Sequence, residues 1–313
     1  MVSDAPVAYR PVVLVGAGRW GRVHVRQWSK ICIQAPLIIV DLDAERSGEV
    51  ARDYQAQSCS SLTESMMMLR HLPRPLICII TPIESLDYVA LEASQWSDLM
   101  FIEKPGVSTV INARGAVGYI ERFNPIRAQL KSMIYQSLCV DSSLRLDTCR
   151  LSQYAPHSPT RLLNDLFCHD FDLLLGILEE YGYQLVELVN INAVLTTRKI
   201  VHHLNVSLMA KFHLLNPSSE KEESLSMMRL PSLLTVNLKS VIGRGDRQRS
   251  WHINQKSTYH LTDHPDDINP LYDQCKLVYD WSLDPLKPLP DPLCSIQQSV
   301  QRVRLLRQLN HYI

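Results

Sequence analysis

Residues 11–41 read PVVLVGAGRWGRVHVRQWSKICIQAPLIIVD, and this stretch decides the fold of the first part of the chain. It opens with the β-branched run Pro11–Val15, passes through a glycine-rich turn into apolar residues at helical spacing, and closes with a second apolar run, Leu37–Val40. Short apolar runs that alternate with helical patterns predict parallel strands joined by helices. The alternation continues, with strands expected at Leu76–Ile80 and Leu99–Ile102 and a helix at Glu84–Ser94.

The turn between the first strand and the first helix carries the pattern G-x-G-x-x-G, at Gly16, Gly18 and Gly21. In this position Gly16 permits a tight turn, Gly18 lets the backbone approach a pyrophosphate, and Gly21 allows the helix to pack closely on the strand. Backbone N–H groups at the start of the helix can then face phosphates. The stretch therefore predicts a Rossmann dinucleotide-binding domain.

An acidic residue ends the second strand, twenty residues after Gly21. This residue is Asp41, and a carboxylate at that place accepts hydrogen bonds from the ribose hydroxyls of NAD and repels the 2′-phosphate of NADP. Asp43 is a nearby alternative, and Arg46 could still reach a phosphate. We therefore expect NAD as the cofactor in preference to NADP.

Two further motifs carry candidate chemistry. Lys104 lies in Glu103-Lys104-Pro105 at the carboxyl end of a predicted parallel strand, where ligands bind in open α/β sheets. Asp165 and His169 are four residues apart in a predicted helix, so a carboxylate can orient an imidazole that acts as a general base. Taken singly, each motif also has a structural explanation. Lys104 could be a surface lysine that follows a strand, and His169 could be a partly buried histidine whose hydrogen bonds are satisfied within a capped helix.

The alternation of short apolar runs with helical patterns ends after residue 118. This change predicts a Rossmann domain over residues 1–118 and an α/β domain over residues 119–313. Longer, partly alternating runs indicate a mostly antiparallel sheet open to solvent on one side. The expected strands are Leu144–Tyr154, Leu185–Thr197, His203–Leu215 and Leu233–Ile242, with helices at Arg161–Tyr181 and Ile296–Leu309 and a polar loop at residues 216–230.

Composition excludes several classes of protein. Lys and Arg total 32, as do Asp and Glu, so no overall field attracts nucleic acid or an anionic membrane. The sequence shows no leader pattern and no run of roughly 18 apolar residues. The eight cysteines form no C-x-x-C pair, which favours a cytoplasmic protein with reduced thiols. His202-His203 lacks partners at metal-ligand spacing, so no metal is expected.

Together, six segments of the chain resemble the Gfo/Idh/MocA family of oxidoreductases: VVLVGAGRWGRVHV, IIVDLD, IITPIES, FIEKP, VGYIERFNP and NDLFCHDFDLLL. The resemblance implies an NAD-binding Rossmann domain followed by an α/β domain whose open sheet makes a homodimer or homotetramer. It implies that Lys104, Asp165 and His169 are the catalytic residues. The implied cofactor-binding set is Gly16, Gly18, Arg19, Trp20, Gly21, Asp41, Thr81, Pro82, Glu103 and Lys104.

The segment VGYIERFNP resembles a signature of family members that oxidise nucleotide-linked amino sugars at the 3-hydroxyl. By this resemblance Arg122 and Asn124 lie near the substrate, and Arg161 completes the expected substrate-binding set. Arg122 could instead be a structural partner at the domain junction. The chain departs from the family where residues 106–116 are too few for the usual crossover helix, and where Leu86 replaces a common histidine.

We therefore expect NAD-dependent oxidation of a secondary hydroxyl, the 3-hydroxyl of a UDP-linked amino sugar. Two alternatives remain open. One is a reductase that uses NAD(P)H on an imine or another non-sugar substrate, because a fold does not fix its substrate. The other is a degenerate member that binds nucleotide as a sensor or scaffold, which the shortened segment 106–116 would fit.

Overall fold

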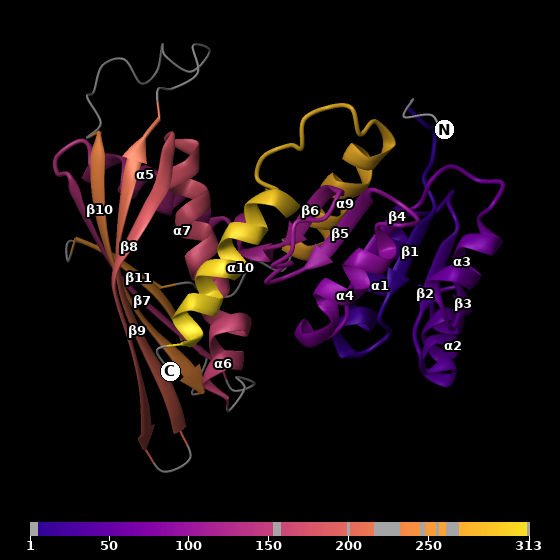
Figure 1. The fold of residues 1–313 in the computed structure, drawn as a ribbon, viewed down its shortest axis with the longest axis horizontal. Coiled ribbons are helices and arrows are strands. Elements are labelled where there is room, and N and C mark those ends of the chain that lie inside the picture. Colours follow the sequence, from indigo (N-terminus) through magenta and orange to yellow (C-terminus); the bar gives the residue numbers. More distant parts are fainter. Residues whose placement is uncertain are drawn as a thin grey trace. The chain divides into compact units, whose positions relative to one another are not determined.

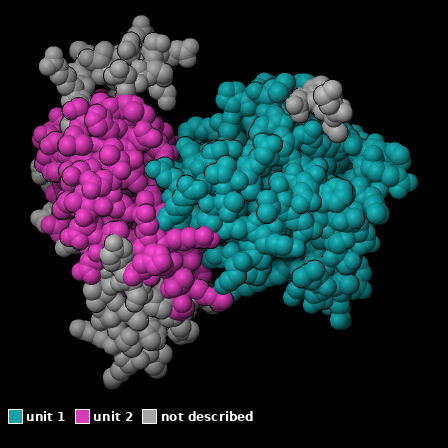
Figure 2. Space-filling model, in the orientation of Figure 1, with its two compact units in different colours: residues 1–123, 266–304 teal, residues 124–265, 305–313 magenta. Residues whose placement is uncertain are grey.

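The computed structural model describes residues 6–152, 158–198, 201–215, 232–244, 248–254, 257–260 and 269–311. The expected loop at residues 216–230 lies outside these described ranges. Contacts divide the chain into two compact units, shown in Figure 2. Unit 1 comprises residues 1–123 and 266–304, and unit 2 comprises residues 124–265 and 305–313.

Unit 1 is built on a sheet whose described strands run in the order β13-β6-β5-β4-β1-β2-β3 (Figure 1). All neighbours pair in parallel except β13 and β6. The central strands are buried on both faces, as their continuous apolar sequences predict. The strands are β1 (Val12–Val15), β2 (Leu37–Val40), β3 (Gln57–Cys59), β4 (Leu76–Ile79), β5 (Leu99–Glu103), β6 (Arg114–Gly118) and β13 (Cys294–Ser295).

Helices pack against this sheet, and α1 illustrates why they form. It buries His24, Val25 and Trp28 at helical spacing while it exposes Arg26 and Lys30, so one apolar face meets the core. The helices of this unit are α1 (Arg19–Ile31), α2 (Ala44–Asp53), α3 (Leu62–Met68), α4 (Ile83–Ala93), the 3₁₀ turn η1 (Ile120–Phe123), α9 (Pro270–Leu283) and the start of α10 (Ile296–Asn310).

The connection from β5 to β6 is the shortened segment that the sequence indicates. Residues 104–113 are all described and form no helix, although the two strands that they join are parallel neighbours. The Asp87 side chain of α4 holds this connection, because it accepts hydrogen bonds from the Ser108 N–H at 2.7 Å, the Ser108 hydroxyl at 2.7 Å and the Thr109 N–H at 3.3 Å. Helix α9 contacts β6 and η1, so a later part of the chain covers this region of the sheet.

Unit 2 contains a mixed, mostly antiparallel sheet of described strands in the order β12-β11-β7-β10-β9-β8. Only β10 and β7 pair in parallel. The predicted fold class, a parallel Rossmann sheet followed by a mostly antiparallel one, is therefore confirmed. The strands are β7 (Ser143–Ser152), β8 (Tyr183–Arg198), β9 (Val201–Leu214), β10 (Leu233–Arg244), β11 (Gln248–Ile253) and β12 (Ser257–His260), and α5 spans Ile126–Leu138.

The helix expected at Arg161–Tyr181 is interrupted. The segment begins as α6 (Pro159–Leu162), widens into the π-helical turn η2 (Leu163–Phe167), and continues as α7 (Cys168–Glu180). Single π turns within α-helices are frequent at functional sites. This one contains Asp165 and directly precedes the turn that carries His169.

The division into units differs from the expected boundary at residue 118. Residues 266–304 return to unit 1 rather than remaining with a domain spanning 119–313. The physical reason is the apolar face of α9, since Leu271, Cys275, Val278 and Trp281 join the same core cluster as Val12, Leu14 and Phe101. A proline-rich stretch then leads to β13, which pairs with β6.

Candidate active site

Four predicted site residues follow the carboxyl ends of neighbouring parallel strands in unit 1. Gly16 follows β1, Asp41 follows β2, Thr81 lies just after β4, and Lys104 follows β5. Strands that pair in parallel end at the same edge of their sheet, so the topology brings these four residues to one edge. This edge is where open α/β sheets bind ligands.

The glycine loop has the close backbone packing that its three glycines predict. Gly16 has a φ of +106°, and a Cβ atom there would lie 2.5 Å from the Ile80 carbonyl oxygen. A Cβ atom at Gly21 would lie 2.0 Å from the Gly16 carbonyl oxygen, whereas one at Gly18 would meet nothing within 4 Å. Gly16 and Gly21 therefore shape the loop, and Gly18 leaves its outer side open to a ligand.

Asp41 is tied to this loop. Its Oδ2 atom accepts a hydrogen bond from the Ala17 N–H at 2.6 Å, and its Oδ1 atom accepts from the Asp43 N–H at 3.0 Å and from Arg46 Nη2 at 2.7 Å. Partial burial acts to raise the pKa of Asp41, but these hydrogen bonds and the charge of Arg46 outweigh it, so the pKa lies below its usual value. Asp41 is therefore an anion at neutral pH.

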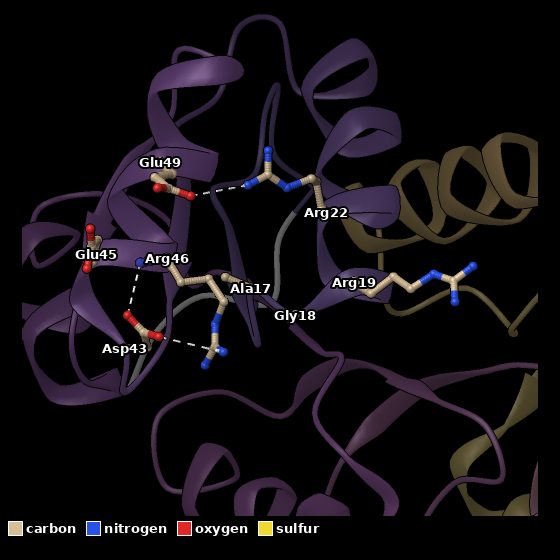
Figure 3. Close-up of a pocket in the computed structure, with 8 residues that line it drawn as sticks. All are labelled: Ala17, Gly18, Arg19, Arg22, Asp43, Glu45, Arg46 and Glu49. Atoms are coloured by element: carbon tan, nitrogen blue, oxygen red, sulfur yellow. Dashed lines mark hydrogen bonds and ion pairs between the residues drawn. The ribbon is translucent and has the colours of Figure 1, made fainter. Parts of the chain in front are cut away.

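A cavity of about 410 Å³ opens beside the loop (Figure 3). It is bounded by the start of α1 and the first turns of α2, and its volume lies in the range of small-molecule sites. In Figure 3 Arg22 reaches towards Glu49, whereas Arg19 extends away from Arg46. The lining residues are Ala17, Gly18, Arg19, Arg22, Asp43, Glu45, Arg46 and Glu49.

A buried hydroxyl at the same edge fits a bound dinucleotide. Thr81 Oγ1 is buried, and it has no hydrogen-bond partner among the described residues. Its backbone nitrogen lies 3.3 Å from the position of a Cβ atom at Gly16, so Thr81 adjoins the glycine loop. Pro82 is the N-cap residue of α4. Trp20, in the first turn of α1, is 44% exposed. A glycine cradle, an anion and an unsatisfied hydroxyl together suit a dinucleotide.

Glu103 points into the interior of unit 1, where it pairs with His24 of α1. The Glu103 Oε1 atom lies 2.9 Å from His24 Nε2, and Oε2 accepts the Lys104 N–H at 3.1 Å. The His24 side chain is fully buried, and that of Glu103 is 8% exposed. A Cβ atom at Gly118 would lie 2.7 Å from Glu103 Oε1, so the glycine makes room for the carboxylate.

This pair links the helix that starts at the glycine loop to the backbone of Lys104. The role of His24 was not predictable from the sequence, since 79 positions separate it from Glu103. The only local signal was a polar residue on the apolar face of α1. Lys104 itself is partly exposed, and the Tyr119 hydroxyl donates a hydrogen bond to the Pro105 carbonyl oxygen at 2.8 Å.

Asp165 and His169 belong to unit 2. Asp165 is partly exposed in η2, and His169 is 9% exposed in the first turn of α7. Next to His169, Asp170 forms a buried ion pair with Arg150 of β7, at 3.0 Å from its Nε atom and 2.5 Å from Nη2. No motif in the sequence indicates this pair, which anchors the first turn of α7 to the sheet.

The three predicted substrate-binding residues lie in different settings. Arg122 is buried in unit 1, and its Nη1 atom donates to the Pro292 carbonyl oxygen at 3.2 Å, so it also has a structural contact. Asn124 is buried, and its Oδ1 atom accepts the Ile126 N–H at 3.1 Å at the start of α5. Arg161 is exposed in α6. Their contacts with a substrate stay predictions.

The described residues contain no group of three or more His, Cys, Asp or Glu side chains that could hold a metal ion. Within the same described ranges, no helix is long and apolar enough to cross a membrane.

Comparisons with known proteins bear on the first domain and on the fold. Residues 10–123 match the model of the GFO_IDH_MocA family, described as an oxidoreductase family with an NAD-binding Rossmann fold. A comparison with curated proteins gives no match.

Solved structures resemble the chain over nearly its whole length. The UDP-N-acetylglucosamine 3-dehydrogenase GnnA from Acidithiobacillus ferrooxidans is 16% identical with a TM-score of 0.63, and 98% of each chain is covered. The myo-inositol dehydrogenase from Lactobacillus casei, in complex with NAD(H) and myo-inositol, is 12% identical with a TM-score of 0.66, covering 97% of this chain and 94% of the other.

The scyllo-inositol dehydrogenase from Lactobacillus casei, with bound NAD(H) and scyllo-inositol, is 13% identical with a TM-score of 0.67, and 97% of each chain is covered. At such identities the likeness shows the fold alone. The family match rests on the domain that carries the glycine loop, Asp41 and Lys104. Over residues 10–123, its dinucleotide-binding domain, the chain matches the Gfo/Idh/MocA family of oxidoreductases with their NAD-binding Rossmann fold.

Proposed function

We propose that the protein is an NAD-dependent dehydrogenase that oxidises a secondary hydroxyl of a sugar, the 3-hydroxyl of a UDP-linked amino sugar. One observation carries the proposal: the glycine loop, Asp41 and Lys104 lie at the carboxyl edge of one parallel sheet. The fold of a UDP-N-acetylglucosamine 3-dehydrogenase is similar over 98% of the chain, which supports this substrate class. NAD-complexed neighbours support the cofactor.

The residues divide the chemistry among them. Gly16, Gly18 and Gly21 bring the backbone close to the pyrophosphate, and Asp41 accepts hydrogen bonds from the ribose hydroxyls. When bound, NAD supplies the hydride acceptor. Oxidation of a hydroxyl also requires that its proton leave, and this is the task of the residues that face the substrate.

In the proposed mechanism His169 takes the hydroxyl proton as the general base, because imidazole titrates near neutral pH. Asp165 orients the ring from the preceding π-helical turn, η2. Lys104 donates a hydrogen bond to the hydroxyl oxygen and stabilises negative charge there as the proton leaves. The mechanism requires Lys104 and His169 to reach the same substrate molecule.

The test is an absorbance assay of NAD reduction with a panel of UDP-linked amino sugars, free sugars and polyols. A scavenger for the keto product prevents an unfavourable equilibrium from hiding turnover. We expect turnover of one UDP-linked amino sugar, and a loss in kcat of roughly 10²–10⁴-fold in His169→Ala, the range for removal of a general base. His213→Ala is the matched control, because His213 is exposed on β9 of the same unit.

The outcomes separate the candidate functions. NAD binding without turnover across the panel would leave the sensor function or a reductase, and oxidation of NADH with imine substrates would identify the reductase. Normal turnover in both Lys104→Ala and His169→Ala would show that the assigned roles are wrong.

We also propose that the sheet of unit 2 mediates a homodimer or homotetramer. Val186 and Val189 on β8 are 61% and 42% exposed, and Leu233 on β10 is 49% exposed. Large apolar side chains on one open sheet favour a protein partner. Sedimentation velocity of the wild type and of Val186→Lys tests this, and a monomer in both would contradict it.

A further inference from the structure

Lys104 is the first residue of the connection from β5 to β6, and this connection lacks the support that such a segment usually has. Parallel neighbouring strands are joined as a rule by a crossover of about a dozen residues or more, most often a helix. Here residues 104–113 join the two strands without a helix. The position of Lys104 therefore depends on individual contacts along the connection.

The start of the connection is held by contacts with the sheet. Glu103, the last residue of β5, accepts the Lys104 N–H at its Oε2 atom, at 3.1 Å, and the Gly106 N–H at its carbonyl oxygen, also at 3.1 Å. The Pro105 carbonyl oxygen accepts a hydrogen bond from the hydroxyl of Tyr119, which directly follows β6. These contacts close a turn at the ends of the two strands.

The middle of the connection is held by one carboxylate of α4. Asp87 Oδ1 accepts the Ser108 N–H at 2.7 Å and the Thr109 N–H at 3.3 Å, and Oδ2 accepts the Ser108 hydroxyl at 2.7 Å. A carboxylate accepts such hydrogen bonds more strongly than a neutral oxygen does. Val107, between the turn and Ser108, is fully buried. A displacement at Ser108 is therefore passed back along a packed segment towards Lys104.

Helix α4 is a firm base for this carboxylate. Leu86 and Ala90, which flank Asp87 along the helix, are 1% and 0% exposed, so the helix is packed into the core of unit 1. The helix also begins two residues after Thr81, whose buried hydroxyl adjoins the glycine loop. Asp87 thus ties the connection to the element that follows the neighbouring strand β4 at the same edge of the sheet.

We propose that Asp87 is a positioning residue that holds Lys104 where it reaches the substrate hydroxyl. It acts through Ser108 and Thr109 on the backbone that carries Lys104. In this chain the carboxylate does what a packed crossover helix would otherwise do. The inference rests on the proposed function and adds to it the residue that supports Lys104.

The first test compares turnover in three variants. Asp87→Ala removes all three hydrogen bonds. Asp87→Asn is the conservative variant, because its one carbonyl oxygen can accept both N–H groups while its amide donates to the Ser108 hydroxyl. Glu92→Ala is the matched control, since Glu92 is a partly exposed acidic residue of the same helix. Thermal melts of each variant confirm folding.

We expect kcat to fall by about 10- to 100-fold in Asp87→Ala, because a displacement of about 1 Å at a reacting group can cost that much. The KM for NAD should change by less than about threefold, and Asp87→Asn should restore kcat to within about threefold of the wild type. Turnover in Asp87→Ala equal to that in Glu92→Ala would overturn the inference.

The same substitution in a Lys104→Ala background shows whether Asp87 acts through Lys104. If it does, Asp87→Ala should lower the residual kcat of Lys104→Ala by less than about twofold, because effects of coupled residues do not add. A loss by the same factor in both backgrounds would overturn the inference, since it would show that the carboxylate affects turnover by another route.

Amide hydrogen exchange at Lys104, resolved by NMR without substrate or NAD, tests the inference apart from the proposed function. We expect exchange at Lys104 to be faster by about fivefold or more in Asp87→Ala and close to wild type in Asp87→Asn. Faster exchange at Ser108 with unchanged exchange at Lys104 would overturn the inference. A wild type without turnover would overturn the proposed function, and the exchange at Lys104 would still decide whether Asp87 holds this residue.

Discussion

Replacement of His24 by leucine tests the buried pair that joins α1 to the end of β5. Leucine keeps an apolar side chain in the fully buried site but removes the group 2.9 Å from Glu103 Oε1. The Glu103 side chain is 8% exposed, and the backbone N–H of Lys104 at 3.1 Å is its other recorded donor. Removal of one partner of a buried hydrogen bond costs about 1–3 kcal/mol, because it leaves a buried polar atom without its partner.

A loss of that size is measurable by differential scanning calorimetry. For a domain of 150–250 residues each kcal/mol corresponds to about 2–4 °C, so we expect the melting temperature to fall by roughly 2–12 °C. The double variant His24→Leu, Glu103→Leu should recover part of this loss, since it leaves no buried carboxyl oxygen without its partner. His71→Leu is the control, because His71 is an exposed histidine of the same unit.

Two results would refute this reasoning. A melting temperature of His24→Leu within about 2 °C of the wild type would show that the pair carries little energy. A double variant that is less stable than His24→Leu by the full cost of Glu103→Leu alone would show that the two side chains are not coupled.

Three further predictions follow from single contacts. Gly21→Ala should weaken NAD binding by at least about tenfold in calorimetry, because its Cβ atom would lie 2.0 Å from a backbone oxygen. Gly48→Ala should not, because a Cβ atom there would meet only the Ser58 hydroxyl, at 4.0 Å. Burial acts to raise the pKa of Asp98, but hydrogen bonds and charge from Arg74 and Arg114 outweigh burial, so the folded pKa lies below the usual value. The ionised Asp98 carboxylate therefore stabilises the fold above its unfolded pKa of about 3.9, and this contribution is lost as pH falls through the folded pKa. In urea titrations, the difference in unfolding free energy between wild type and Asp98→Asn should shrink between pH 7 and pH 3. Asp87→Ala should accelerate amide hydrogen exchange at Ser108 by about tenfold or more, and unchanged exchange would contradict the role of that carboxylate.

The parallel core of unit 1 was predictable because its signal is local. The run Leu37–Val40 is the strand β2 with the predicted bounds, and three of the other expected strands differ from β1, β4 and β5 by one residue at an end. Strand β6 was not predicted, since its sequence RGAVG carries one β-branched residue and two glycines. Gly115 has a φ of +146°, and a Cβ atom there would lie 1.8 Å from the Met100 carbonyl oxygen, so close strand approach overrides propensity.

The rest depends on contacts between distant residues. The His24–Glu103 and Arg150–Asp170 pairs join positions 79 and 20 residues apart, and neither has a spacing that a motif could reveal. The parallel pairing of β10 with β7 follows from topology rather than from the pattern of either strand. The glycine loop and Asp41 were predictable, because the chemistry of a pyrophosphate requires those residue types at that spacing.

The return of residues 266–304 to unit 1 has consequences for synthesis on the ribosome and for transfer of the domain by recombination. The ribosome synthesises all of residues 124–265 before it supplies α9 and β13, so the nascent dinucleotide-binding domain lacks Leu271, Cys275 and Val278 from its core during that interval. The apolar surface that these residues later cover stays exposed during that interval. For the same reason, genetic recombination cannot transfer this domain to another protein as one uninterrupted segment.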